Sequence, residues 1–207
     1  GIRYLVGEPG AEIGIATNGT YYKFTNIDEE SSACGNFEGS IKQADMYYAV
    51  YPYRQNMVMT AEQTINLPSV QTYREGSFDK GMAPMVGRAY DGETIAFMNL
   101  CGVLSLSITG TDVIKSISFM AKDESGNNAI VCGDCTINMN YTTFPELSTT
   151  SAGGTILMLD CGEGVQLDAA EPTLFHLVLP PATYHGFSLV IATADGKFME
   201  KNSDKHL

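Results

Sequence analysis

The chain lacks several features that would point to common protein classes. Its 207 residues contain no tryptophan, three histidines, and only 12 lysine and arginine residues against 24 aspartate and glutamate residues. A net charge of −12 repels phosphate, which argues against nucleic acid as a partner. No stretch approaches the roughly 18 consecutive apolar residues of a membrane-spanning helix. No basic segment followed by an apolar one is present, so we expect any export signal to have been removed.

Recognisable catalytic motifs are also missing. The sequence has no G-x-S-x-G, no H-E-x-x-H and no Walker A motif. His176 lies in an apolar, strand-like segment, where we expect it to point outward or to satisfy a hydrogen bond in the core. His185 lies in a polar loop, and acidic pairs such as Asp123-Glu124 are flanked by turn residues typical of solvated surface. The sequence therefore predicts no catalytic residue and no enzyme.

The five cysteines are too few for a disulfide scaffold, and their number is odd. Cys132 and Cys135 form a C-x-x-C pair, but zinc needs further ligands at suitable spacing. A thioredoxin-type pair opens a helix, whereas the two residues between these cysteines are expected in a turn between strands. We expect Cys101 and Cys161 to be small buried side chains, and a disulfide between them stays open. No metal site and no cofactor are predicted.

Short alternating segments dominate what is present. Apolar and polar residues alternate along Gly102–Thr109 and Phe187–Thr193, and no window shows a convincing amphipathic helix. Turn signals recur every 8–12 residues, which predicts an all-β, antiparallel β-sandwich with under about a tenth helix. We expect ten to twelve strands in a single domain over residues 1–207. The predicted core consists of Leu104, Leu106, Ile108, Ile117, Phe119, Leu177, Leu179, Phe187, Leu189 and Ile191.

A tyrosine-rich segment is the candidate ligand-contact surface. Within Asp45–Tyr53, alternation places Tyr47, Tyr51 and Tyr53 on one face of a strand that ends or lies at an edge at Pro52. Tyrosines at a surface can stack against sugars. The alternative is that these tyrosines line a half-exposed sheet face, and carbohydrate-binding modules usually use tryptophan as well.

Three stretches of the sequence resemble a known family. They are EIGIAT with FEGSIKQADMYYAVYPYRQ, then FMNLCGVLSLSITG, and finally TILMLDCGEGVQL through GFSLVIATADGK. Together they cover most of the chain from Glu12 to about Lys201, and they resemble the fimbrillin-like family of Bacteroides and its relatives, which includes FimA-type pilus subunits. The resemblance implies a transthyretin-like, Greek-key sandwich, a lipoprotein precursor exported to the outer membrane, and often a second domain.

The resemblance also implies how such a protein is used. A strand from a neighbouring subunit would complete an open sheet, since an extended segment satisfies unpaired backbone groups along its length. We therefore expect a non-enzymatic fimbrial subunit or adhesin at the surface of an anaerobic gut or oral bacterium. Its partners would be other fimbrial subunits or copies of itself, and host or bacterial surface glycans or proteins. Membrane contact would come only from the lipid anchor of the precursor. The alternative is a carbohydrate-binding module of a glycan-uptake system.

Overall fold

The computed structural model describes residues 7–90 and 94–207, and the chain is all-β across these residues. The described part contains no helix that is long and apolar enough to cross a membrane. The strands are β1 (Glu12–Thr17), β2 (Thr20–Asn26), β3 (Phe37–Glu38), β4 (Tyr47–Tyr51), β5 (Glu62–Leu67), β6 (Val70–Thr72), β7 (Met85–Ala89), β8 (Ala96–Asn99), β9 (Gly102–Ile108), β10 (Val113–Ala121), β11 (Gly133–Asn138), β12 (Leu147–Thr149), β13 (Leu157–Gln166), β14 (Thr173–Leu179), β15 (His185–Thr193) and β16 (Phe198–His206).

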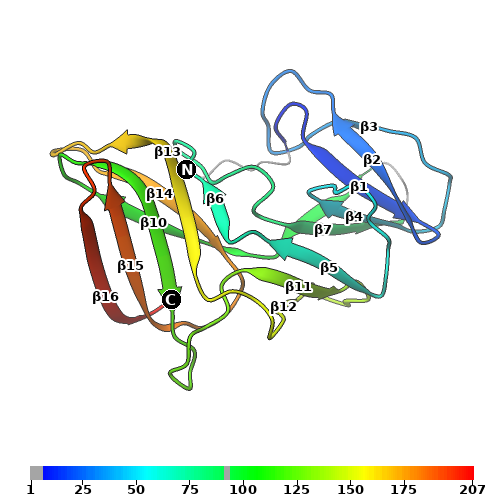
Figure 1. Cartoon of the computed structure of the whole chain (residues 1–207). Coiled ribbons are helices and arrows are strands. Elements are labelled where there is room, and N and C mark those ends of the chain that lie inside the picture. Colours follow the sequence, from blue (N-terminus) through cyan, green and yellow to red (C-terminus); the bar gives the residue numbers. More distant parts are fainter. Residues whose placement is uncertain (1–6, 91–93) are drawn as a thin grey trace.

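Two pairs of sheets make up the molecule (Figure 1). In the first pair, a six-stranded sheet of order β3-β2-β1-β4-β7-β8 packs on a three-stranded sheet of order β12-β11-β5. In the second pair, a five-stranded sheet of order β16-β15-β10-β13-β6 packs on the two-stranded sheet β14-β9. Strand β8 passes into β9 through Leu100 and Cys101, so one continuous segment connects the two pairs.

The second pair of sheets encloses the core that the sequence predicts. Phe119, Ile117 and Leu177 are fully buried there. All ten predicted core residues belong to this cluster or pack against it, which confirms the prediction. Four of them, Leu104, Leu106, Ile108 and Phe187, are only half-buried. Three of these four come from β9, which indicates that the core is incompletely covered on the β9 side.

Local sequence signals account for several elements. Asn18 and Gly19 form the two-residue turn of the β1–β2 hairpin, with φ angles of 50° and 83°. Positive φ at both central positions is the geometry that asparagine and glycine accept best. The predicted break at Pro52 is confirmed, because β4 ends at Tyr51.

Other predictions differ from the structure. The two residues between Cys132 and Cys135 were expected in a turn, but they begin β11 and pair with β5. The sequence indicated ten to twelve strands, whereas the described residues contain sixteen. The additional ones include the two-residue β3 and the three-residue β6. The reason is that segments this short become strands only by pairing: β3 pairs with the preceding strand β2, and β6 pairs in parallel with the distant strand β13.

Candidate functional site

The edges of the sheets decide where another strand could attach. Among the described strands, three edge strands have seven residues or more, namely β9, β14 and β16. An unpaired edge presents free N–H and C=O groups to any extended chain. The three long edges differ in how those groups are protected.

The outer edge of β14 is occupied at one residue by a side chain. Gln71 of β6 is 2% exposed, and its amide makes two hydrogen bonds to the backbone of Val178. Its Nε2 donates to the Val178 carbonyl at 2.8 Å, and its Oε1 accepts from the Val178 N–H at 2.9 Å. The amide group of Gln71 thus replaces a neighbouring strand at this point of β14.

The contact between Gln71 and Val178 also establishes which backbone N–H and C=O groups of β9 point away from β14. Both backbone groups of Val178 point to Gln71, so its opposite residue Val103 belongs to a non-hydrogen-bonded pair of the β14–β9 ladder. The N–H and C=O of Val103 therefore point away from β14. Because the pattern repeats every second residue, those of Ser105 and Ser107 do so too. In the described part of the chain no strand pairs with this side of β9.

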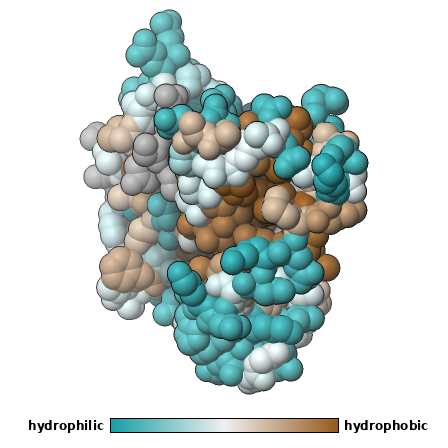
Figure 2. All heavy atoms as spheres, turned by 90° about the vertical axis from the view of Figure 1, so that its left-hand side faces the viewer, coloured by the Kyte–Doolittle hydropathy of each residue, from teal (hydrophilic) through white to brown (hydrophobic). Residues whose placement is uncertain are grey.

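The side chains of β9 complete an unprotected edge. Leu104, Leu106 and Ile108 face the core of the second sheet pair and stay half-buried, and β9 carries no charged residue. Figure 2 shows the side of the molecule that carries β15 and β16, where apolar atoms gather in a hollow with hydrophilic rims. A strand added beside β9 would cover apolar surface of this core.

Strand β16 is protected by charge. Of its nine residues all but Ser203 are exposed, and they include Lys201 and Lys205. Lys201 lies opposite Leu189, whose side chain is in the core, so the lysine sits on the core-facing side of an edge strand. Charges at such positions oppose further strand pairing. We conclude that β9 is the candidate strand-acceptor edge.

The three candidate tyrosines do not form one surface. Tyr47 and Tyr51 are 7% and 4% exposed, and their hydroxyl groups accept from the N–H groups of Ala44 and Gly81. Tyr53 packs on the opposite face of the six-stranded sheet, so its predicted position on one face with the other two is wrong. The reason is that β4 ends at Tyr51, and two-residue alternation does not extend past the strand.

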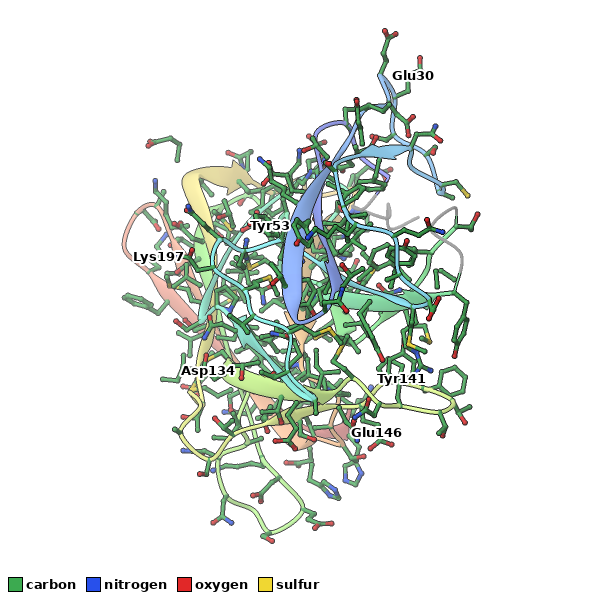
Figure 3. All side chains as sticks on the ribbon, turned by 90° about the vertical axis from the view of Figure 1, so that its right-hand side faces the viewer. Glu30, Tyr53, Asp134, Tyr141, Glu146 and Lys197 are labelled. Atoms are coloured by element: carbon green, nitrogen blue, oxygen red, sulfur yellow. The ribbon has the colours of Figure 1, made fainter. Side chains whose placement is uncertain are left out.

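Tyr53 instead covers a glycine. A Cβ atom on Gly14 of β1 would lie 3.1 Å from the ring of Tyr21 and 3.2 Å from that of Tyr53. Figure 3 shows Tyr53 beside the β1–β2 hairpin. Tyr51 and Tyr53 also line an open hollow of about 230 Å³, together with Glu8, Glu12, Arg54 and Lys80. Two of the three candidate tyrosines thus meet at one polar hollow, and Tyr47 does not.

A buried carboxylate organises one wall of this hollow. Glu8 is 4% exposed, with Arg74 Nη2 2.6 Å from its Oε1 and Lys80 Nζ 3.2 Å from its Oε2. Burial raises the pKa of Glu8, but the hydrogen bonds and charges of Arg74 and Lys80 outweigh that effect and hold the pKa below 4.5. The ion pairs connect the segment before β1 to the 73–81 loop, which indicates a structural role.

The cysteine pair cannot act as one chelating or redox unit. Cys132 lies in the core of the second sheet pair, whereas Cys135 lies in the core of the first. Burial, with smaller effects of Asp134 and Cys132, raises the pKa of Cys135 to about 11, and burial raises the pKa of Cys132 as well. Thiols that stay protonated are poor nucleophiles and poor metal ligands. All five cysteines are free thiols.

His176 makes a hydrogen bond in the core, which is the second of the two alternatives that the sequence predicts. It is 5% exposed, and its Nδ1 lies 2.8 Å from Ser105 Oγ across the β14–β9 ladder. Burial lowers the pKa of His176 below 6.5, which favours the neutral ring.

Stability is therefore expected to fall as the pH drops from 7.5 to 5. The unfolded chain binds the histidine proton at a higher pH than the folded chain, so the contribution is complete above pH 6.5 and is lost below it. Urea unfolding at several pH values should show a smaller loss for His176→Gln than for the wild type. Equal slopes for wild type and His176→Gln would contradict the assignment.

Comparison of the chain with models of protein families, with curated proteins and with solved structures gives no match.

Proposed function

We propose that this chain is a non-enzymatic cell-surface subunit, of a fimbrial or adhesive kind, that joins its neighbours by strand complementation at β9. The observation that carries the proposal is the free edge of β9. Its outward N–H and C=O groups belong to Val103, Ser105 and Ser107, and its three core-facing side chains are half-buried. On the other long edges, Gln71 occupies the backbone groups of Val178 in β14, and β16 carries two exposed lysines.

The geometry of β9 specifies the donor strand. Residues of the donor opposite Leu104, Leu106 and Ile108 would face the core and should be apolar. The residues between them would lie on the face of Ser105 and Ser107 and should be polar. A slip of one residue would turn every side chain to the wrong face. A neighbouring subunit, or another copy of this chain, would supply such a segment.

A short alternating peptide should bind the folded chain and stabilise it. The probe is a capped octapeptide of alternating valine and threonine, titrated against the protein. A ligand that binds only the folded state raises the free energy of unfolding by about 2.7 kcal/mol at a concentration of 100 times Kd. Thermal unfolding and fluorescence anisotropy of a labelled peptide measure the effect.

The matched control is an octapeptide of the same composition with four valines followed by four threonines, which cannot present one apolar face. Equal binding of both peptides would show non-specific association. If neither binds, and electron microscopy of the native cell surface shows no fibre containing this protein, the assembly proposal is wrong.

A second candidate function is glycan binding, and the polar hollow at Tyr53 is the observation that favours it. Tyr53 and Arg54 lie beside two carboxylates and a lysine there, a mixture of groups that can hydrogen-bond sugar hydroxyls. We place this function second because Tyr47 and Tyr51 are buried and offer no exposed stacking face. A glycan array discriminates the two functions, since a subunit that only assembles should bind no sugar.

A further inference from the structure

Two histidines far apart in the sequence lie side by side at the β15–β16 edge. His185 is the first residue of β15 and His206 the last of β16, and they are direct cross-strand partners. Their ring centroids are 4.3 Å apart, and both side chains are exposed. Neither histidine takes part in the strand-acceptor edge, so the pair requires its own explanation.

The ladder around the pair explains the short distance between the rings. Tyr184 and Leu207 exchange two backbone hydrogen bonds of 3.1 Å each, while the His185 N–H donates to Lys122 on the other side of β15. The His185–His206 pair is therefore the next, non-hydrogen-bonded position of the ladder. Side chains stand closest together at such positions. The backbone thus holds the two rings on the same face of the sheet.

This geometry suits two ligands on one metal ion. Zinc binds histidine nitrogen at about 2.0–2.1 Å, so two nitrogens at a tetrahedral angle lie roughly 3.3 Å apart. Rings with centroids 4.3 Å apart can bring one nitrogen each to that separation by rotation about χ2, which is a soft torsion for histidine. Imidazole is a preferred ligand of Zn²⁺, Ni²⁺ and Cu²⁺.

We propose that His185 and His206 form a surface site for a late first-row divalent cation, with two imidazole ligands and water in the remaining positions. In the part of the chain that the structure describes, no group of three or more histidine, cysteine, aspartate and glutamate side chains could hold a metal. The site is therefore bidentate and open.

The surroundings of the pair permit a cation. Lys122, whose carbonyl accepts from the His185 N–H, directs its Nζ to Asn128 Oδ1 at 2.8 Å. Lys205 precedes His206 on β16, at an irregularity of the β15–β16 register. The net charge of −12 attracts cations to the molecule as a whole. Binding would connect the end of the exposed strand β16 to β15.

Isothermal titration with ZnCl₂ and NiCl₂ tests the site in the full chain. The background is Cys34→Ser, because Cys34 is an exposed thiol that could bind zinc itself. We expect one ion per chain, an upward shift of Tm with added metal, and loss of binding in acid, where protons compete for the imidazoles. Removal of either ligand, in His185→Gln or in His206→Gln, should weaken binding by at least about tenfold.

Two controls make the outcome decisive. Glu200 lies on β16, the strand of His206. The Glu200→Gln variant loses a negative charge but keeps both imidazoles, so it should bind metal like its parent. His176→Gln removes a buried ring and should leave the affinity unchanged. The proposal is overturned if the parent binds no ion, or if the His185→Gln, His206→Gln double variant binds as tightly as the parent.

Discussion

Replacement of Phe119 by alanine is expected to lower the free energy of unfolding by about 3–5 kcal/mol. Phe119 has no exposed surface, and its ring makes an edge contact with Tyr184 at 6.1 Å and a stacked contact with Phe187 at 6.0 Å. Such aromatic pairs add about 0.5–1.5 kcal/mol to the burial itself. Because Phe119 has no exposed surface, the cavity left by alanine would lie inside the core.

Urea unfolding of wild type and variant measures this difference. The matched control is Phe198→Ala, because Phe198 is 75% exposed on the edge strand β16. That variant should change stability by less than about 0.5 kcal/mol. Similar losses for the two variants would show that the core is not centred on Phe119.

The core of the second sheet pair could be predicted because its strands alternate regularly. Ile117 and Phe119 point inward on β10 as the two-residue period requires. Ile114 is equally buried, but it is out of phase with them. A bulge between Ile114 and Ser116 shifts the register against both neighbouring strands and turns Ile114 inward. No pattern in the local sequence marks that bulge.

The full lengths of two long strands, β13 and β16, could not be predicted from the sequence, for different reasons. Strand β13 runs through Gly162 and Gly164, whose φ angles of 55° and 113° are typical of turns, yet the ladder with β10 resumes after them. Strand β16 continues to His206 although its second half is polar. It is a strand because β15 provides backbone partners along almost its whole length, and pairing of this kind does not depend on apolar side chains.

The candidate acceptor edge could be predicted only in outline. The sequence indicated an open sheet without saying which strand is open. That choice depends on Gln71, whose amide contacts Val178 across 107 positions of the chain. A single glutamine in a three-residue strand gives no signal of such a role. The same limitation applies to Tyr53, because its position depends on where β4 ends and on the glycine that it covers.

A pair of proline substitutions on β9 should separate folding from strand acceptance. The N–H of Ser107 points to the free edge, whereas the N–H of Leu106 takes part in the ladder with β14. Proline is tolerated where the missing N–H faces outward from an edge strand. Ser107→Pro should therefore cost less than about 1 kcal/mol of stability. Leu106→Pro breaks a ladder hydrogen bond and should cost more than about 2 kcal/mol.

Peptide binding, unlike folding, should be strongly weakened by Ser107→Pro. Ser107→Pro removes one of three outward donors and places its ring where an incoming strand must approach, so a folded variant should bind the alternating valine–threonine peptide at least about tenfold more weakly. The measurement is the fluorescence anisotropy titration of the labelled peptide, with circular dichroism to verify folding. Glu200→Gln on the opposite edge strand should leave peptide binding at the wild-type level. Undiminished binding to Ser107→Pro would mean that the peptide attaches elsewhere, and β9 would then not be the acceptor.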